Sequence, residues 1–248
     1  MKKYAFFLLI IFTFGTISAQ SLVEQANNAY TSKNFEQAVT LYEQVLKENG
    51  ASPEVYYNLG NACFRLKQIA PAILNYERAL LLDPGNKDIR YNLAFAQTKT
   101  VDKIEPIGEF FLTTAYNSVC NLLSANQWSY SAIIFFLLFI AGASLFFFTR
   151  RVIWKKTGFY SGIVFLVFCL IFNTFAYNQK KELTHRHTAI IFAPTTTIKS
   201  TPDTGGADLF ILHEGTKVEI TNQSGDWSEI ETADGNVGWI KRSEIEII

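Results

Sequence analysis

Two long apolar runs, separated by a short cationic stretch, limit what this chain can fold into more than any other feature. Residues 129–148 and 157–177 contain no charged side chain. Each run approaches the ~20 apolar residues that a helix needs to cross ~30 Å of hydrocarbon. Because lipid offers no partner for backbone N–H and C=O groups, both runs are predicted to be helical. We therefore expect transmembrane helices over 129–149 and 157–177.

The stretch between the two runs predicts their orientation. Residues 150–156 contain four cations, namely Arg150, Arg151, Lys155 and Lys156. Short loops rich in Lys and Arg stay in the cytoplasm, so the two spans should form a hairpin with a cytoplasmic bend. Aromatic residues near the span ends, Trp128, Tyr130 and Trp154, are typical of membrane interfaces. The regions on either side of the hairpin would then share the compartment outside the cytoplasm.

The N-terminus predicts export independently of the hairpin. Residues 1–19 have the layout of a secretory signal peptide, with Lys2 and Lys3 before an apolar stretch and small residues up to Ala19. Cleavage is expected before Gln20; an uncleaved N-terminal anchor is the alternative. A signal peptide would send the following domain across the membrane, in agreement with the cationic bend.

Small residues within the spans predict close helix packing. Gly158 and Gly162 lie one helical turn apart, and residues 141–144 (AGAS) fall at comparable depth on the other span. These residues serve either packing within the hairpin or docking onto another membrane protein. Residues 101–128 are expected to be a juxtamembrane amphipathic linker, lying at the bilayer surface or acting as a simple packed spacer. Residues 178–186 are a second linker.

The N-terminal half repeats itself with a period of 34 residues. The pairs related by this period include Ala26 and Gly60, Asn27 and Asn61, Tyr30 and Phe64, Ala38 and Ala72, Tyr42 and Tyr76, and Leu46 and Leu80. A period of this length with helical spacing predicts a solenoid of stacked helix pairs. We expect the array over residues 20–100, as two repeats followed by residues 88–99 as a third first helix or a solvating cap.

The second unit resembles the tetratricopeptide repeat. The residues at that family's signature spacing are Tyr56, Leu59, Gly60, Cys63, Ala72, Tyr76 and Pro84. The resemblance implies that first helices line a concave face suited to an extended peptide, with amides bonding its backbone. The residues expected on that face are Asn27, Tyr30, Tyr57, Asn58, Asn61, Phe64, Arg65, Tyr91, Asn92 and Phe95. A solvated face without a ligand is the alternative. Val23 and Asp88 replace two lysines of the family's carboxylate clamp, so that specificity is not transferred.

From residue 187 to residue 248, the spacing of apolar residues changes from the period of a helix to the period of two that is typical of short strands. TKVEIT, SEIET and VGWIK alternate as half-buried strands do, and Asp234-Gly235 predicts a hairpin turn. The segment resembles bacterial SH3 domains. The matching pieces are Pro202, Glu214-Gly215, Val218, Gly225-Asp226-Trp227 and Gly238-Trp239-Ile240. Trp227 and Trp239 are candidates for a ligand groove, or parts of the barrel core.

Nothing in the sequence predicts catalysis, a metal site or a cofactor. The three histidines do not stand in a nucleophile–base motif, and no phosphate loop precedes a helix. Cys63, Cys120 and Cys169 lack metal spacing and are expected to be unpaired thiols; a Cys63–Cys120 bridge is the alternative. The formal net charge is +0, so no general attraction to nucleic acid is implied.

The whole chain is therefore expected to be a multidomain membrane protein: an all-α tetratricopeptide-repeat array, a two-helix transmembrane hairpin and a small all-β SH3-like barrel. This order is similar to that of the BatE family of the Bacteroides aerotolerance operon. The resemblance implies an inner-membrane protein beside von Willebrand A-domain membrane proteins and a MoxR-type ATPase, in envelope stress or aerotolerance. We expect a non-enzymatic scaffold; the alternatives are a peptidoglycan-binding sensor and an envelope enzyme without a recognisable motif.

Overall fold

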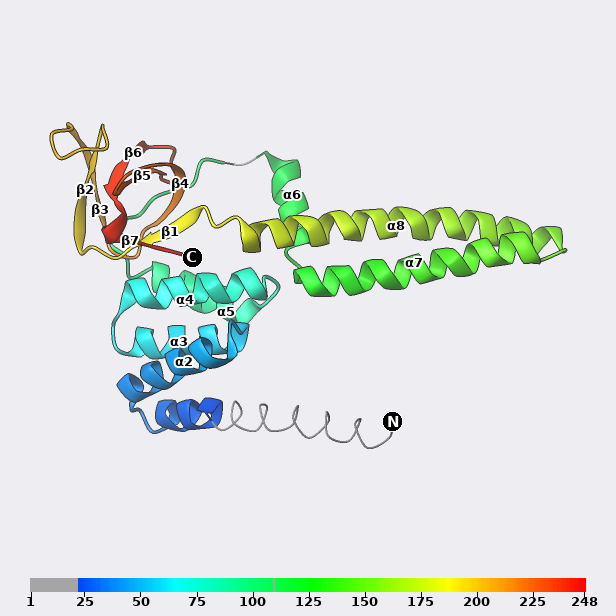
Figure 1. Cartoon of the computed structure of the whole chain (residues 1–248), viewed down its shortest axis with the longest axis horizontal. Coiled ribbons are helices and arrows are strands. Elements are labelled where there is room, and N and C mark those ends of the chain that lie inside the picture. Colours follow the sequence, from blue (N-terminus) through cyan, green and yellow to red (C-terminus); the bar gives the residue numbers. More distant parts are fainter. Residues whose placement is uncertain (1–21, 109) are drawn as a thin grey trace. The chain divides into compact units, whose positions relative to one another are not determined.

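The computed structural model describes residues 22–108 and 110–248, so the expected signal peptide lies outside the described residues. The chain divides into two compact units (Figure 1). One unit, here called the array–barrel unit, contains residues up to 81, residues 86–108 and residues 186–248. The other, the hairpin unit, contains residues 82–85 and 109–185. Each unit is described by itself.

The N-terminal part of the array–barrel unit is a stack of helices. Residues 22–31 are helical and are followed by α2 (Phe35–Asn49), α3 (Pro53–Arg65), α4 (Ile69–Leu82) and α5 (Lys87–Gln97). Asn34, Ser52 and Asn86 cap α2, α3 and α5, each accepting hydrogen bonds from backbone N–H groups of the first turn. The helix pairs predicted from the 34-residue period are confirmed, and α5 stands where a third repeat would begin.

Small residues let the paired helices of the array approach closely. Ala26, Ala38 and Ala72 are fully buried. A Cβ atom on Gly60 would lie 2.7 Å from two ring carbons of Tyr76, so the ring packs directly over the α3 backbone. Substitution at Gly60 would push that ring out of its place in the core.

The C-terminal part of the same unit is a seven-stranded antiparallel sheet, here called the barrel after the expected SH3-like fold. Its strands are β1 (Thr188–Ile191), β2 (Thr195–Lys199), β3 (Asp208–His213), β4 (Lys217–Ser224), β5 (Trp227–Glu231), β6 (Val237–Lys241) and β7 (Ile245–Ile247). The strand order is β3-β2-β6-β5-β4-β1-β7. Side chains alternate between the two faces along each strand, and those that point inward, among them Ile198, Ile230 and Ile240, form the core. Gly235 turns between β5 and β6 with φ +82°, as the predicted hairpin requires.

The array and the barrel share apolar packing. Ile190 of β1 and the C-terminal Ile248 are fully or almost fully buried in the same cluster as the array core, and Phe192 packs against it. After α5, the chain runs along the barrel: Ile104 packs on the barrel core, and the backbone N–H of Ile107 donates to the carbonyl oxygen of Ala233 at 3.0 Å. These contacts join segments that are far apart in the sequence, on either side of the hairpin.

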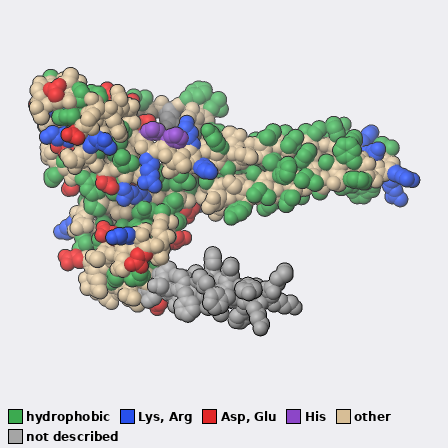
Figure 2. Space-filling model, viewed as in Figure 1, with side chains coloured by type: hydrophobic (Ala, Val, Ile, Leu, Met, Phe, Trp, Pro, Cys, Tyr) green, Lys and Arg blue, Asp and Glu red, His purple; other side chains and the backbone are tan. Residues whose placement is uncertain are grey.

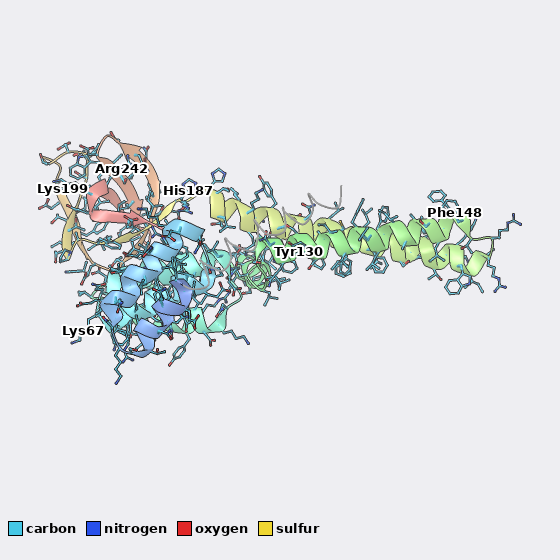
Figure 3. All side chains as sticks on the ribbon, turned by 60° about the horizontal axis from the view of Figure 1, so that its bottom comes forward. Lys67, Tyr130, Phe148, His187, Lys199 and Arg242 are labelled. Atoms are coloured by element: carbon cyan, nitrogen blue, oxygen red, sulfur yellow. The ribbon has the colours of Figure 1, made fainter. Side chains whose placement is uncertain are left out.

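The hairpin unit consists of α6 (Phe111–Cys120), α7 (Ala125–Phe148) and α8 (Val152–Thr184). Of the described residues, α7 and α8 are the two helices long and apolar enough to cross a membrane. Hydrophobic side chains cover both helices along their length, and the Lys and Arg side chains of the bend lie at the tip (Figure 2). Tyr130 lies near the end of the hairpin opposite the bend, here called its base, and Phe148 lies at the bend (Figure 3).

The helices extend beyond the predicted spans. A capping box at Ser124 and Gln127 starts α7 at residue 125, before the first strongly apolar residues. At the other end α8 begins at Val152, so Lys155 and Lys156 lie in its first turns and not in a loop. It continues through residues 178–184, which were expected to be part of a linker, because that polar stretch contains no Gly or Pro to end the helix.

The glycines of the hairpin face each other. A Cβ atom on Gly158 would lie 2.6 Å from the carbonyl oxygen of Gly142, and one on Gly142 would lie 3.1 Å from the Cα of Gly162. Further along the seam, the Phe135 ring packs against Phe168 and Phe172 with centroid distances of 5.4 and 5.1 Å. The small residues therefore serve packing within the hairpin, the first of the two interpretations offered by the sequence.

Candidate partner-binding surfaces

A polar network joins the first helices of the array. Tyr76 Oη donates to Asn61 Oδ1 at 2.7 Å, and Asn92 Nδ2 donates to the same oxygen at 2.9 Å. Asn92 Nδ2 also lies 2.9 Å from Tyr57 Oη, to which it donates. Three residues expected on the concave face, Tyr57, Asn61 and Asn92, are therefore brought together. The Asn61 amide nitrogen and the Asn92 amide oxygen are the atoms of this network through which a peptide could be bonded.

The first repeat contains the same contact one period earlier. Tyr42 Oη donates to Asn27 Oδ1 at 2.7 Å, as Tyr76 does to Asn61. Burial raises the pKa of Tyr42 to about 12, with a smaller contribution from Tyr30, so the phenol stays a donor at physiological pH. The carbonyl groups of both asparagines thus hold the second helix of their own repeat. The sequence interpretation, in which these amides only face a ligand, missed this structural role.

Aromatic side chains extend the face towards α5. The Phe64 and Phe95 rings pack together with a centroid distance of 5.5 Å. Phe95 nevertheless remains 45% exposed, and Tyr91, one turn before it, is 72% exposed. Contiguous exposed apolar patches with a polar rim mark interaction sites, whereas single exposed apolar residues do not. This part of the face offers apolar contact area beside the amide network.

Arg65 and Tyr30 both contact Phe35, a residue that was not among those expected on the concave face. The Arg65 guanidinium lies 5.1 Å from the centroid of the Phe35 ring, and Tyr30 packs edge-on against the same ring at 5.3 Å. Phe35 opens α2, where the following repeat has the apolar Ile69, so the 34-residue period contained the signal. Asn58 is half-buried on α3.

The two tryptophans of the barrel lie on its outer face. In the β5–β6 register Trp227 stands opposite Lys241, and Trp239 stands opposite Glu229. Since side chains alternate along a strand, both rings share one side of the sheet, opposite the buried Ser228 and Ile230. Both are half-buried, so they are not core residues, which was the alternative interpretation. Lys241 Nζ lies 6.0 Å from the Trp227 ring centroid, so this ring already faces a cation.

A carboxylate in the segment after α5 fastens that segment to the barrel. Asp102 Oδ2 accepts from the backbone N–H of His213 and from Thr216 Oγ1, both at 2.7 Å, and Asp102 Oδ1 lies 2.7 Å from His213 Nδ1. Burial opposes the charged form of Asp102. The hydrogen bonds from Thr216 and His213 outweigh burial and hold the pKa of this carboxyl below its usual value. No sequence motif indicated this contact, because its partners lie over a hundred residues apart.

Two ion pairs join α4 to the barrel. Arg78 Nη2 donates to Glu246 Oε1 at 3.1 Å and to the Ile247 carbonyl at 2.6 Å. Lys217 Nζ donates to Glu77 Oε2 at 2.8 Å. Each acidic or basic residue on α4 thus meets an opposite charge on a strand. Part of the surface of α4 is therefore occupied by the barrel.

The described residues do not bring together a catalytic constellation. The Asp102, His213 and Thr216 side chains meet, but the Thr216 hydroxyl bonds the carboxylate and not the imidazole, so no nucleophile is paired with a base. Within residues 22–108 and 110–248, no three His, Cys, Asp or Glu side chains are grouped as metal ligands. Burial raises the pKa of the free Cys63 thiol to about 12, which suppresses its thiolate form.

The cations predicted to set the topology lie together at the tip of the hairpin. Arg150 and Arg151 form the bend between α7 and α8. Lys155 and Lys156 follow on α8, and Lys155 Nζ lies 6.0 Å from the Phe146 ring centroid. Four cations therefore lie together at the bend, whereas Lys180 and Lys181 lie near the opposite end of α8.

Comparisons with known proteins identify two modules. A family model of the tetratricopeptide repeat matches residues 53–86, and a model of the bacterial SH3 domain matches residues 194–246. Sperm-associated antigen 1 of Mus musculus is 33% identical over 78 residues, and that of Rattus norvegicus is 32% identical over 78 residues. Both matches cover 32% of this chain and 9% of the relative, so the chain spans about a tenth of these proteins.

Among solved structures, the crystal structure of the Sgt2 TPR domain from Aspergillus fumigatus matches with 16% identity and a TM-score of 0.31. That match covers 67% of this chain and 82% of the other. The family matches indicate protein–protein or peptidoglycan interaction, and no enzymatic family is among them. The chain contains a tetratricopeptide-repeat region, two long apolar helices and a bacterial SH3-type domain.

Proposed function

We propose that this protein is a non-enzymatic adaptor of the bacterial inner membrane that holds an extended segment of a partner protein on the concave face of its array. The observation that carries the proposal is the combination of the Asn61–Asn92 amide network with the exposed rings of Tyr91 and Phe95. Amides can bond the backbone of an extended chain, and rings can cover its apolar side chains.

The contacts between array and barrel support a shared compartment for the two modules. The array precedes the hairpin and the barrel follows it, yet Ile190 and Ile248 are buried in the array's apolar cluster. Two spans return the chain to the side from which it entered, so this packing is compatible with α7 and α8 crossing the membrane together. With the cationic bend in the cytoplasm, both modules would be periplasmic.

The similarity in domain order to the BatE family suggests what the partner is. In that family's setting, von Willebrand A-domain membrane proteins and a MoxR-type ATPase stand beside the protein, in envelope stress or aerotolerance. We propose a membrane-anchored partner of that kind, whose extended segment reaches the concave face from the periplasmic side.

A peptidoglycan-binding sensor is the second candidate function, because Trp227 and Trp239 lie outward on one face of the barrel. Stacking on sugar or peptide groups would suit such rings. The charge of the barrel favours a protein ligand instead: residues 187–248 contain ten acidic and four basic residues. Since the stem peptides of peptidoglycan carry carboxylates, the excess negative charge opposes wall binding.

Crosslinking in native membranes tests the adaptor function. Full-length protein with Tyr91→Ala and Phe95→Ser should lose most of the partner that the parent recovers, because both substitutions remove exposed rings; Phe95→Ser also removes the ring contact with Phe64, so helicity of the variant is measured alongside. The matched control is Gln44→Ala, an exposed residue of α2 outside the concave face. Equal partner recovery by all three proteins would contradict the proposal.

Sedimentation of the full-length protein in detergent with purified wall sacs separates the two functions. The adaptor proposal expects no retention above a control without sacs. Retention that is lost with Trp227→Ala and Trp239→Ala, while partner crosslinking persists, would favour the sensor.

A further inference from the structure

Helix α6 stands out because almost all of its surface is exposed. Of its ten residues only Cys120 is buried, and Phe111 and Leu112 are 69% and 56% exposed. Its N-terminal residue Phe110 provides no side-chain cap, and the helix carries no charged residue in its first or last turn. Isolated helices of this length are marginal in water, so α6 needs an environment that stabilises it.

The sequence around α6 resembles a membrane segment more than a soluble linker. Residues 110–149 contain no Asp, Glu, Lys, Arg or His, a run of 40 residues. A single span needs about 20. The uncharged run therefore extends back from α7 through all of α6.

Apolar and polar side chains of α6 lie on opposite sides. At 3.6 residues per turn, one side holds Phe111, Leu112, Ala115, Tyr116 and Val119. The other side holds Thr113, Thr114, Asn117 and Ser118. The division into an apolar side with two aromatic rings and a polar side is that of a helix lying in a membrane interface, although the polar side of α6 carries no Lys or Arg.

The contacts of α6 place it at the end of the apolar part of α8. Tyr116 packs edge-on against Phe175 with a centroid distance of 5.4 Å and bonds Asn178. Gln179 Nε2 donates to the Cys120 carbonyl at 3.0 Å, and Trp128 Nε1 donates to the same oxygen at 2.8 Å. Lys180 and Lys181 follow immediately on α8. This is the level at which the predicted span meets the headgroup region.

Helix α6 also runs across the hairpin and not along it (Figures 1 and 3). If α7 and α8 cross the bilayer, a helix fixed across their base lies in the plane of the membrane surface. The two spans also expose apolar side chains, among them Ile133, Val164 and Ile171, so a bilayer that surrounds the spans would meet α6 at their base.

We infer that α6 is a third membrane-binding element, which lies in the interface of the leaflet opposite the cationic bend with Phe111, Leu112 and Val119 in contact with lipid. The inference rests on the proposed insertion of the hairpin. It implies that an in-plane helix at one end and the cationic bend at the other limit movement of the hairpin along the bilayer normal.

Site-directed spin labelling of the full chain in phospholipid nanodiscs tests this inference. Labels are attached to Leu112→Cys and to the matched control Asn117→Cys on the polar side of α6. All cysteine-labelling measurements on this protein use a background in which the free Cys63, Cys120 and Cys169 are replaced by alanine, and that background is the labelling blank. At Leu112 we expect collisions with lipid-soluble oxygen to exceed those with an aqueous nickel chelate, and the opposite order at Asn117. The apolar face of such a helix should lie about 5–10 Å below the headgroup boundary.

A label at Val164→Cys, on the exposed surface of α8, tests insertion of the hairpin separately from the placement of α6. Lipid contact at Val164 without lipid contact at Leu112 would overturn the role of α6 and leave the hairpin proposal standing. Water contact at Val164 would overturn the insertion itself. A Leu112 label that neither oxygen nor the nickel chelate reaches would mean that protein covers α6, which also contradicts the inference.

Discussion

The array and the hairpin are both built from pairs of helices that small residues bring close together, but different groups complete each contact. In the array, Gly60 lies under the Tyr76 ring, and the Tyr76 hydroxyl then bonds Asn61. In the hairpin, Gly142 and Gly158 meet backbone to backbone, and phenylalanine rings fill the rest of the seam.

The difference is the one expected if the array lies in water and the hairpin, as proposed, lies in lipid. In water the hydrophobic effect drives the helices of the array together, and polar groups at the seam are tolerated because each finds a partner. In lipid no such force exists between apolar helices, so association depends on close packing. The hairpin should therefore be sensitive to shape alone, whereas the array–barrel unit should also be sensitive to the loss of single hydrogen bonds.

The largest effect is expected for Gly158→Ala. The new Cβ would meet backbone atoms of α7, the Gly142 oxygen at 2.6 Å and the Phe146 nitrogen at 2.9 Å, which no rotamer change can relieve. The helices should move apart towards the upper part of the range of about 8–10 Å found for packed helices. Pulsed EPR distances between labels at Ile134→Cys and Val167→Cys measure this separation.

Gly162→Ala is the matched control for that measurement, because its Cβ would have its nearest neighbour at 3.8 Å, an ordinary contact. Equal distances in the parent and in both variants would show that the glycine contact does not set the spacing of the hairpin.

Gly60→Ala should destabilise the array by about 1–3 kcal/mol, the usual cost of overpacking a core. The Tyr76 ring, 2.7 Å from the added carbon, would have to shift and weaken its bond to Asn61. Thermal unfolding of the full chain in detergent checks this. Gly50→Ala would not be a neutral control, since its φ of +84° favours glycine; Gly108→Ala has no atom within 4 Å and serves instead.

Asp102→Asn should lower the free energy of unfolding by about 2 kcal/mol, because the hydrogen bonds of a partly buried carboxylate are replaced by those of a neutral amide. The sign of the pH dependence follows from the lowered pKa of Asp102 in the folded state. Its contribution is complete above the unfolded pKa of about 3.9 and is lost as the pH falls through the lower folded value.

Acid unfolding curves of parent and variant test this dependence. The stability difference between the two should be constant near neutral pH and shrink only below about pH 4. A difference that persists unchanged to the lowest pH would contradict the role given to the charge of Asp102.

A small effect is expected for Tyr76→Phe, a loss of about 1 kcal/mol in the free energy of unfolding for one neutral hydrogen bond. Tyr42→Phe removes the equivalent bond in the first repeat, where Asn27 is exposed, and should cost less. Chemical unfolding of the two variants measures both losses. If both substitutions lower the free energy of unfolding equally, the Asn61–Asn92 bond adds no stability beyond the tyrosine–asparagine bond that both repeats share.

The sequence predicts the architecture well because each part has a period of its own. The 34-residue repeat, the strand alternation and the two uncharged runs require no knowledge of contacts over long distances. The packing of Ile190 and Ile248 against the array, and the bonds of Asp102 to His213 and Thr216, depend on a meeting of segments separated by the whole hairpin. No local pattern encodes such a meeting.

The candidate site could be predicted only in part for the same reason. Helical spacing places Tyr57, Asn61 and Asn92 on first helices, but it does not tell whether an amide faces a ligand or the next helix. The structure assigns the Asn61 oxygen to Tyr76 and leaves the exposed Tyr91 and Phe95 as the clearest contact surface. The outward position of Trp227 and Trp239 likewise became clear from strand register.

Cysteine accessibility in intact cells tests most directly whether array and barrel share the periplasm. In a background without the three native cysteines, single cysteines would replace the exposed Gln44 of the array, the exposed Thr204 between β2 and β3, and Ile153 beside the cationic bend. A maleimide that passes outer-membrane pores but not the inner membrane should label Gln44→Cys and Thr204→Cys and spare Ile153→Cys until the cells are permeabilised. Labelling of only one of the first two positions, or of Ile153→Cys in intact cells, would contradict this topology.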